Sequence, residues 1–384
     1  MRHDATSPRY QVCTRTVMDT SDPDIRFDDD GVSNYVPEFE AFMAGLPPPE
    51  ARKAELEARI ARIKAEGKGK RYDCVLGLSG GVDSSYLAYL AKEWDLRPLV
   101  VHFDNGWNSE LAVDNIERIV SHLGFELATH VMNWEEFRDL QRSYFLASVV
   151  DIEVPTDNLI FGALFRLAAK HKVRTILSGT NYATEWLMPP RWNYRKNDAV
   201  NIRAIQAKFG TRKLRELPLL GVWNQGRYTL VNGIRTFAPL NLVDYSKAGA
   251  KTLLKEELGW RDYGGKHYES VFTRFYQGYV LPRKFGIDKR RAHLSTLILT
   301  GEITRDEALA ELQQPTYDEA LQAEDRAYVG KKLGFSEEEF ERILAADPVP
   351  HEAYGTDARQ REWFFSMVNA LQRLRRTATG AKSG

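Results

Sequence analysis

The chain of 384 residues has little cysteine, no net charge and no long apolar run, and each of these shortages excludes a class of protein. Cys13 and Cys74 are its only cysteines, which rules out a framework of disulfides and suits a reducing compartment. The formal net charge is zero, so a basic nucleic-acid footprint over the whole chain is not supported. The opening residues MRHDATSPRYQV lack the apolar core of a secretory signal, and no run of about 18 apolar residues suggests a membrane span. We therefore expect a soluble, cytoplasmic protein that binds neither membranes nor nucleic acid.

Short apolar runs alternate with helical patterns in the first half of the chain, and hydrophobic residues make up 43% of the whole. The strands predicted from these runs are 72–79, 97–103, 126–132 and 175–179. The helices predicted between and after them are 82–94, 108–124, 134–149 and 156–172. This alternation predicts an α/β fold, a doubly wound parallel sheet of the Rossmann-like type with helices on both faces.

Composition divides the chain into five segments. Residues 1–48 are irregular and rich in turns, and residues 49–70 hold a charged helix and a short linker. The α/β domain is expected over 71–262, and a mostly helical C-terminal region over 263–375. Residues 376–384, with the sequence RTATGAKSG, are expected to form a flexible tail.

The turn after the first predicted strand reads SGGVDSS, residues 79–85. It opens a helix at the carboxyl end of a strand, where doubly wound sheets bind ligands and helix amides bind anions. Two glycines would let a phosphate approach the backbone, and three hydroxyls would add donors. These residues are Ser79, Gly80, Gly81, Ser84 and Ser85. Asp83 beside a phosphate is repulsive unless a cation lies between them, which indicates Mg²⁺. The spacing fits neither a Walker A loop nor a dinucleotide fingerprint, and the alternative is a structural corner with Asp83 as N-cap.

Polar residues also follow the second and fourth predicted strands. HFDNGW, residues 102–107, places Asp104 at the end of the second strand, and SGTNYATE, residues 178–185, places Glu185 after the fourth. Asp104 suits either a turn or a contact with a nucleotide. Glu185 taken alone is best explained as a first-turn glutamate favoured by the helix dipole. Because Glu185 and Asp83 follow neighbouring strand ends, the two carboxylates together predict a Mg²⁺ site.

SGGVDSS resembles the PP-loop of the N-type ATP pyrophosphatase superfamily, whose pattern is SGGxDS. This superfamily has a HUP-like α/β fold and includes NAD synthetase, asparagine synthetase, GMP synthetase and tRNA-modifying enzymes. The resemblance implies that the loop holds the pyrophosphate of ATP, which is cleaved between its α and β phosphates to adenylate a substrate. SGTNYATE is similar to the G-T-x-x-A-x-E of NAD synthetase, which implies that Glu185 shares Mg²⁺ with Asp83. The residues that the resemblance assigns to ATP in the other two loops are Asp104, Gly179 and Thr180.

The chain as a whole is similar to the N-acetyl sugar amidotransferase family, which makes acetamidino sugars for surface polysaccharides such as the O-antigen of lipopolysaccharide. The similarity covers roughly residues 12–312. It is carried by CTRTVMDTSDPDIRFDDDGVSNYV, the PP-loop, HFDNGWNSELAVDNIERI, SGTNYATE, IRAIQAKFG and GGKHYESVFTRFYQGYVLPRKFGIDKRRAHLS. The last of these, residues 264–295, is the most specific, and by this resemblance the C-terminal region completes the active site.

The family resemblance implies ATP and Mg²⁺ as cofactors and an N-acetyl sugar, as a nucleotide sugar or a sugar acid, as substrate. Adenylation of the acetamido oxygen makes AMP the leaving group, and attack by ammonia leaves an acetamidino group, AMP and pyrophosphate. No glutaminase is evident, because Cys74 lies within a predicted strand and Cys13 has no evident histidine partner. A separate glutaminase is therefore implied, in this family a pair resembling the subunits of imidazole glycerol phosphate synthase.

Lys266 is the predicted cation on the leaving pyrophosphate, since related enzymes need a lysine there, and glycines before it suit a mobile lid. Its alternative is a solvated loop lysine. With Asp83 and Glu185 it completes the predicted catalytic set. A basic, aromatic-rich segment around it would face either a sugar diphosphate or uronate, or solvent; its members are His267, Arg274, Arg283, Lys284, Arg290 and Arg291. The sugar pocket is predicted to be lined by Arg191, Trp192 and Tyr194.

The N-terminal segment departs from the family pattern. Many relatives carry CxxC…CxxC there, at the spacing of a zinc ribbon, but the four positions read Cys13, Thr16, Ser33 and Val36 in this chain. One thiolate cannot hold a structural zinc, so we expect a degenerate knuckle without zinc over residues 1–48.

Two other functions remain open. One is another PP-loop ligase that forms amides or amidines, such as an NAD synthetase-like or a tRNA lysidine synthetase-like enzyme. Neutral net charge weakens the RNA option, and the family-like C-terminal stretch disfavours both. The other is a non-enzymatic scaffold, which the lost zinc ligands suggest and the intact SGGVDS motif opposes.

Overall fold

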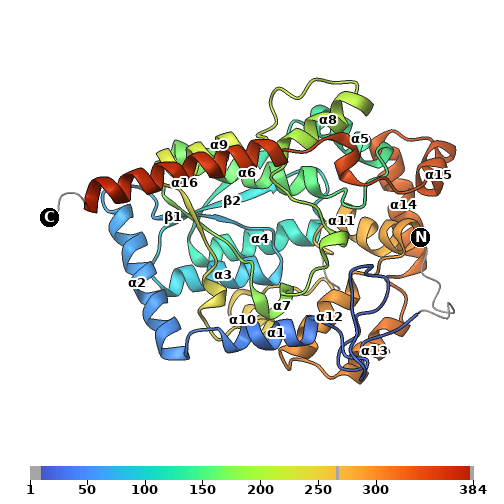
Figure 1. Ribbon diagram of the computed structural model, residues 1–384, viewed down its shortest axis with the longest axis horizontal. Helices are drawn as coiled ribbons and strands as arrows, with labels where there is room; N and C mark the ends of the chain where they lie inside the picture. Colours follow the sequence, from blue (N-terminus) through green and yellow to red (C-terminus); the bar gives the residue numbers. More distant parts are fainter. Residues whose placement is uncertain (1–9, 265–267, 381–384) are drawn as a thin grey trace.

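A parallel sheet of five strands forms the centre of the molecule in the computed structural model, which describes residues 10–264 and 268–380 (Figure 1). The strands are β1 (Cys74–Gly77), β2 (Pro98–Asp104), β3 (Glu126–Val131), β4 (Thr175–Leu177) and β5 (Arg235–Phe237). Their order is β3-β2-β1-β4-β5, and every neighbouring pair is parallel. The chain adds β2 and β3 on one side of β1 and then returns to add β4 on the other. The predicted doubly wound α/β fold is therefore confirmed.

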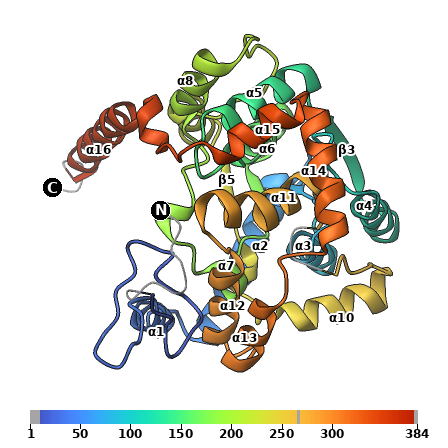
Figure 2. The same cartoon turned by 90° about the vertical axis from the view of Figure 1, so that its right-hand side faces the viewer.

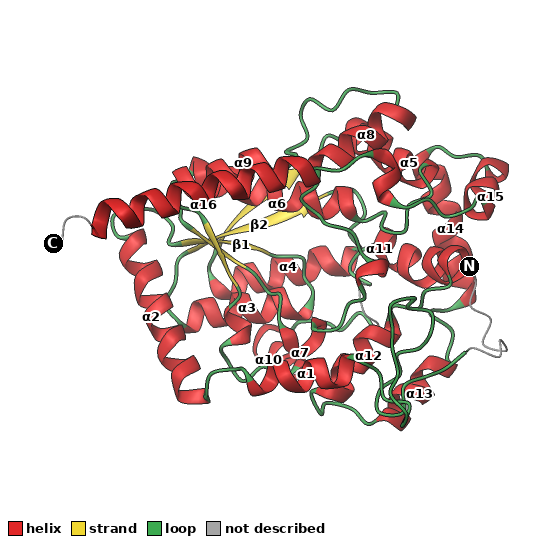
Figure 3. Cartoon of the chain, viewed as in Figure 1, coloured by secondary structure: helices red, strands yellow, loops and turns green. Residues whose placement is uncertain are grey.

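Helices cover both faces of this sheet, as Figure 3 shows. One face packs on α2 (Pro49–Gly67), α3 (Val82–Glu93), α4 (Glu110–Leu123) and α10 (Lys247–Leu258). The other face packs on α5 (Trp134–Leu146), α6 (Val154–Lys170) and α8 (Ala199–Phe209). Because side chains alternate along a strand, Cys74 and Leu76 of β1 enter the first core and Val75 enters the second. Both faces of the central strands are thus buried, which explains their continuous apolar runs.

The fifth strand was not predicted, because β5 has only three residues and two of them, Arg235 and Thr236, are polar. It forms at the edge of the sheet through parallel pairing with β4, where Ile176 lies opposite Thr236. Tertiary pairing therefore decides its structure, and local pattern does not.

The N-terminal segment is less irregular than predicted, because it contains the helix α1 (Tyr35–Ala44). This helix buries Val36 and Phe39, and the ring of Phe39 packs edge-on against Trp186 with the centroids 5.0 Å apart. Its N-cap residue, Asn34, makes no capping hydrogen bond through its side chain, so the packing face and not a cap accounts for the helix.

The four knuckle positions still converge, although only Cys13 is a metal ligand by type. The backbone amides of Thr16 and Ser33 donate to Cys13 Sγ at 3.3 and 3.2 Å, and all four side chains are buried. Burial opposes ionisation, but these hydrogen bonds lower the pKa of the Cys13 thiol overall. Hydrogen bonding and packing thus hold the turns that a metal would otherwise tie together.

The C-terminal region is mostly helical, as predicted. Its helices are α11 (Val271–Phe275), η4 (Tyr276–Phe285), α12 (Arg290–Leu299), α13 (Arg305–Gln313), α14 (Glu319–Leu333), α15 (Glu337–Ala345), η5 (His351–Tyr354) and α16 (Ala358–Gly380). Figure 2 looks onto the side of the molecule that is on the right in Figure 1, and α11, α12 and α14 lie on this side. α16 continues through Gly380, so the expected flexible tail is helical over 376–380, while 381–384 lie outside the described residues.

Shorter helices occupy the connection between β4 and α10. They are α7 (Tyr182–Glu185), η1 (Pro190–Trp192), α9 (Val222–Gly226), η2 (Arg227–Val231) and η3 (Pro239–Asn241). Over the part of the chain that the structure describes, no helix is both long enough and apolar enough to cross a membrane.

Candidate active site

The predicted phosphate loop follows β1 at the switch point of the sheet, where the order of the strands reverses between β1 and β4. Gly80 has φ +83°, a conformation that favours glycine. A Cβ there would also lie 2.7 Å from Tyr263 Oη and 2.9 Å from the carbonyl oxygen of Ala112. Both the backbone angle and the crowding therefore require glycine at this position. In doubly wound sheets this switch point is where ligands bind.

The hydroxyls of the loop are organised partly by one another. Ser84 Oγ accepts from the Ser79 amide at 3.3 Å, lies 3.1 Å from Ser79 Oγ and donates to the Gly81 carbonyl at 3.2 Å. Ser79 is exposed, whereas Ser85 is fully buried in α3, and its hydroxyl has no partner among the described residues. Ser79 and Ser84 thus lie within the loop as predicted, and Ser85 faces the core.

Two aromatic side chains that sequence reasoning missed fix the carbonyl of Gly80. Trp260 Nε1 and Tyr263 Oη donate to that oxygen at 2.8 and 2.9 Å. A carbonyl tied into the protein cannot turn toward the loop's concave side, where its partial negative charge would repel a phosphate. The two residues lie 180 and 183 positions from Gly80 in the chain, so no local motif could reveal them.

The loop after β4 packs directly on the phosphate loop. A Cβ on Gly179 would lie 3.2 Å from the carbonyl carbon of Asp83 and 3.3 Å from the amide nitrogen of Ser84. Asn181 Nδ2 donates to Asp83 Oδ1 at 3.4 Å, and Asn181 Oδ1 caps α7 by accepting from the Thr184 amide at 2.9 Å. The two predicted strand-end motifs are therefore in contact, with a glycine where their backbones meet.

Tyr245 contacts Asp83 and is close enough to Glu185 to feel its charge. Its hydroxyl donates to Asp83 Oδ1. Burial raises the pKa of Tyr245 well above its ordinary value, and the nearby charges of Asp83 and Glu185 add to the rise. Asp83 is half-buried and Glu185 is exposed. Mg²⁺ is commonly held by one or two carboxylates together with substrate phosphates, so this oxygen donor set fits Mg²⁺.

No cluster of three or more metal-ligating side chains occurs in residues 10–264 and 268–380. A metal held by Asp83 and Glu185 would thus depend on oxygens from the bound nucleotide and water, as is usual for Mg²⁺.

Lys247, the first residue of α10, is a further residue that sequence reasoning missed. Burial lowers its pKa, while the charge of Asp83 acts in the opposite direction. Lys247 Nζ lies 3.4 Å from His293 Nε2, and His293 Nδ1 lies 3.1 Å from the carbonyl of Thr184, one residue before Glu185. This arrangement places an amine beside the acidic loop and links α12 to the short helix α7.

The turn after β2 is joined to the C-terminal region. Asp104, at the end of β2, accepts from the Gly106 amide through Oδ1 at 3.0 Å, so it forms the turn that was one of its two predicted roles. Asn108 pairs with Ser270 in an antiparallel bridge, and the Ser109 amide donates to the Glu269 carbonyl at 2.9 Å. The C-terminal region therefore borders the carboxyl edge of the sheet at β2.

The remaining predicted site residues have other positions. Lys266 and His267 lie outside the described residues. Most of the basic segment is engaged within the protein: Arg274 pairs with Asp325, Lys284 donates to the Ile343 and Ala346 carbonyls, Arg290 pairs with Asp288, and Arg291 pairs with Asp19. Arg283, which is exposed, lies over the ring of Tyr279. These contacts account for the segment structurally, without a diphosphate or a uronate.

Two of the three residues expected to line the sugar pocket lie in the core instead. Trp192 is fully buried, and the hydroxyl of Tyr194 donates to the buried Asp198 at 2.8 Å. Arg191 is exposed and pairs with Asp24 at 3.1 Å. The aromatic pair belongs to the core, so the prediction for these two residues is wrong.

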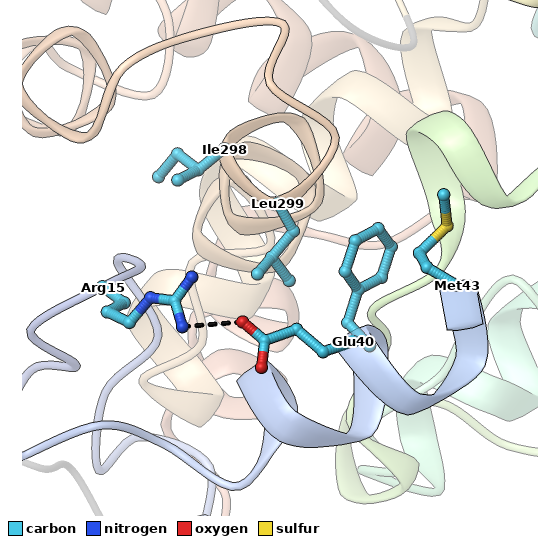
Figure 4. Close-up of a pocket in the computed structure, with 6 residues that line it drawn as sticks. Arg15, Glu40, Met43, Ile298 and Leu299 are labelled. Atoms are coloured by element: carbon cyan, nitrogen blue, oxygen red, sulfur yellow. Dashed lines mark hydrogen bonds and ion pairs between the residues drawn. The ribbon is translucent and has the colours of Figure 1, made fainter.

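A hollow of about 360 Å³ lies between α1 and α12, and Figure 4 draws the side chains around it. It is lined by Arg15, Phe39, Glu40, Met43, Ile298 and Leu299. Arg15 and Glu40 form an exposed ion pair of 2.7 Å across it. None of the strand-end residues lines this hollow, so we do not place the reaction there.

Comparison with known proteins agrees with the arrangement at the sheet edge. Residues 72–181 match the asparagine synthase family, and residues 269–372 match the family described as LPS biosynthesis protein WbpG-like, C-terminal domain. Two domain types therefore meet in this chain. The first is a PP-loop ATP pyrophosphatase-type domain, and the second is a WbpG-like C-terminal domain. The first match supports the predicted superfamily over residues 72–181, and the second supports an LPS-related family.

The individual proteins that resemble this chain share less than a third of its residues. The uncharacterized protein MJ1599 of Methanocaldococcus jannaschii is 27% identical over 288 residues, which cover 72% of this chain and 84% of that protein. Among solved structures, an NH3-dependent NAD synthetase from Campylobacter jejuni is 15% identical, with 74% of this chain and 97% of that chain covered and a TM-score of 0.35. An NMN synthetase from Francisella tularensis is also 15% identical, with 77% and 97% covered and a TM-score of 0.31.

Proposed function

We propose that this protein is an ATP-dependent amidotransferase that converts the acetamido group of an N-acetyl sugar to an acetamidino group, with release of AMP and pyrophosphate. The asparagine synthase-type domain indicates an ATP-dependent ligase of the amide-forming kind. The WbpG-like domain points to a sugar of surface polysaccharide biosynthesis as the substrate. The observation that carries the proposal is the meeting of these two domains at the carboxyl edge of the sheet, where the phosphate loop lies.

The chemistry divides into two steps that the site supports. The acetamido oxygen attacks the α-phosphorus of ATP, the bond to the β-phosphate oxygen breaks, and pyrophosphate leaves. Ammonia then attacks the activated carbon, the bond from that carbon to the AMP oxygen breaks, and loss of a proton leaves the amidine. The loop from Ser79 to Ser84 would hold the phosphates through its backbone amides. Lys247 is the described cation best placed to offset the charge that develops on them.

Asp83 and Glu185 would hold Mg²⁺ beside the phosphates, and the ion would supply charge neutralisation there. Tyr245 and Asn181 orient Asp83 by donating to its Oδ1, so the carboxylate is fixed before a nucleotide arrives.

Ammonia would come from a separate glutaminase. Glutamine hydrolysis by a thiol needs an accessible cysteine, but Cys13 and Cys74 are both 0% exposed. Burial also raises the pKa of Cys74 far above its ordinary value, which keeps that thiol protonated. We therefore propose a partner protein, resembling the subunits of imidazole glycerol phosphate synthase, as the ammonia source.

The test is a pyrophosphate-release assay with ATP, Mg²⁺, ammonium in place of the glutaminase, and a panel of N-acetylated nucleotide sugars. We expect AMP and pyrophosphate with one sugar, and a product in which NH has replaced O in the mass spectrum. Release of ADP and phosphate would contradict the mechanism. AMP formation with nicotinic acid adenine dinucleotide and with no sugar would favour the NAD synthetase-like alternative.

The variant Asp83→Asn tests the metal and phosphate assignment. We expect it to reduce pyrophosphate release by about 10²-fold or more, the size of loss typical when a preorganised electrostatic group is removed. Asp95→Asn is the matched control, because Asp95 is an exposed aspartate whose side chain is 95% accessible. Full activity in Asp83→Asn would contradict the assignment.

A further inference from the structure

A lysine from the C-terminal domain contacts the turn that follows β2. Lys332, on α14, donates through its ammonium to the carbonyl of Gly106 and to Tyr328 Oη, the latter at 2.7 Å. The two residues of the first contact are 226 positions apart in the sequence. None of the patterns in the sequence indicates this contact.

Three aromatic rings surround the same ammonium. Lys332 Nζ lies 4.7 Å from the ring centroid of Trp107, 5.1 Å from that of Trp134 and 4.9 Å from that of Tyr328. Trp107 is almost fully buried, and its indole nitrogen donates to Gln141 at 2.8 Å, so this ring is fixed in place. Cation–π attraction strengthens when the cation is partly removed from water, as it is here. Rings and carbonyl together hold the ammonium in one position.

The turn that Lys332 contacts has a backbone conformation that favours glycine. Gly106 has φ +76°, and a Cβ on it would lie 3.3 Å from the ring of Trp134. Asp104 Oδ1 and Asn105 Oδ1 accept from the amides two residues ahead, each at 3.0 Å. The Met132 amide donates to the Asp104 carbonyl at 3.0 Å and the Val271 amide donates to the Trp107 carbonyl at 2.9 Å, so both ends of the turn are tied to neighbouring elements. Lys332 adds the contact at the middle of the turn, where its ammonium holds the carbonyl of Gly106.

The position of the turn matters because β2 is the neighbour of β1. The turn and the phosphate loop therefore lie side by side at the carboxyl edge of the sheet, so a nucleotide held by the phosphate loop would reach the turn. A loop held in its bound position before the ligand arrives binds more tightly, since less conformational entropy is lost on binding.

We propose that Lys332 is a positioning residue for the nucleoside triphosphate, holding the 104–107 turn in the conformation that the nucleotide contacts. This inference rests on the proposed function for its ligand. It gives the C-terminal domain a role in nucleotide binding, since α14 would set the affinity for the nucleotide while making no contact with the reacting atoms.

The test measures binding of an ATP analogue with a methylene group between the α and β phosphates, in the presence of Mg²⁺, by calorimetry on the full chain. We expect Lys332→Met to weaken binding about tenfold, as loss of a partly desolvated cation–π contact and a charge-assisted hydrogen bond predicts. Lys332→Arg should stay within about threefold of the wild type, because a guanidinium also stacks on aromatic faces. Lys331→Met, at the exposed neighbouring residue, should leave binding unchanged.

Kinetics separate positioning from general damage. Lys332→Met should raise KM for ATP about tenfold with kcat within about twofold, because the reacting groups stay in place. If Lys332→Met does not fold, Tyr328→Leu removes one ring of the cage from a side chain already 46% exposed, and it should weaken binding about threefold.

These measurements distinguish a failure of the role proposed for Lys332 from a failure of the proposed function. Wild-type affinity in Lys332→Met, or in Tyr328→Leu where the first variant is unfolded, would overturn the role of Lys332 and leave the proposed function standing. Equal weakening in Lys332→Arg and Lys332→Met would also overturn it, because the charge would then be irrelevant. Failure of the wild type to bind the analogue would overturn the proposed function and this inference together.

Discussion

At the scale of single residues, the phosphate loop is held by aromatic side chains from distant parts of the chain, because Tyr245 donates to Asp83 while Trp260 and Tyr263 donate to the carbonyl of Gly80. Gly80 and Asp83 were predicted because a glycine-rich turn with an acid is recognisable from neighbouring letters. Tyr245, Trp260 and Tyr263 were missed, because each touches the loop from more than 160 positions away. Contacts between residues so far apart cannot be recognised from the spacing of residues in a motif, because only folding brings the residues together.

Gly80 gives the sharpest residue-scale prediction. We expect Gly80→Ala to weaken binding of the methylene ATP analogue at least tenfold, because the new Cβ would meet Tyr263 Oη and the Ala112 carbonyl and push the loop open. The measurement is calorimetry, with the melting temperature recorded alongside.

Gly69→Ala is the matched control for Gly80→Ala. Gly69 has a similar φ of +77°, but no atom lies within 4 Å of a Cβ placed there. It carries the same backbone strain without the crowding, so it should lose some stability and no nucleotide affinity. Equal affinity in the two variants would show that crowding at Gly80 does not shape the site.

At the scale of elements, prediction succeeded where periodicity is long and failed where it is short. α4 was predicted over 108–124 and forms over Glu110–Leu123, where Ser109 caps it by accepting from the Ala112 amide. β5 and α1 were missed because their structure depends on partners, Ile176 for the strand and Trp186 for the helix. Short elements are decided by tertiary contacts, which outweigh weak local preferences.

The short helix α7 carries the element-scale prediction. Asn181→Ala removes the cap of α7 and one donor to Asp83, which should cost about 1 kcal/mol of stability. Because α7 orients Glu185, we also expect the Mg²⁺ concentration for half-maximal pyrophosphate release to rise severalfold. The measurement is a Mg²⁺ titration of activity.

The matched control for Asn181→Ala is Ser336→Ala, which removes an equivalent side-chain cap from α15. A similar loss of stability with unchanged Mg²⁺ dependence is expected there. If both variants show the same Mg²⁺ dependence as the wild type, Glu185 does not help to hold the ion.

At the scale of the whole molecule, no pattern in the sequence indicates that the N-terminal segment packs on helices of the C-terminal region. The Val17 amide donates to Ser295 Oγ at 3.2 Å, and Arg305 donates to the carbonyls of Cys13 and Thr16. The knuckle is thus seated on α12 and α13, and this seat explains how it persists with one cysteine of four. Such long-range packing cannot be read from composition or periodicity, which describe only neighbours along the chain.

His351 joins three distant parts of the molecule and makes the fold sensitive to acid. Its Nε2 accepts from the Asp151 amide at 3.3 Å, its Nδ1 lies 3.1 Å from Asn201 Oδ1, and its ring stacks on Tyr194 with the centroids 4.1 Å apart. Burial lowers the pKa of His351 to about 4, against the opposing charges of Asp151 and Asp198. The folded protein therefore keeps this ring neutral at pH values where the unfolded chain protonates it.

The sign of the pH effect follows from that difference. Between about pH 6.5 and pH 4 the unfolded state binds one more proton at this site, so the free energy of unfolding falls as pH falls, by about 3 kcal/mol at most. Urea unfolding at pH 7.5 and pH 4.5 measures it. His351→Gln keeps a donor and an acceptor but cannot titrate, so it should start less stable from imperfect packing and lose less stability on acidification. An identical loss in both proteins would show that acid acts elsewhere, on carboxylates whose ion pairs hold the same region, such as Asp151 with Lys196 at 2.7 Å.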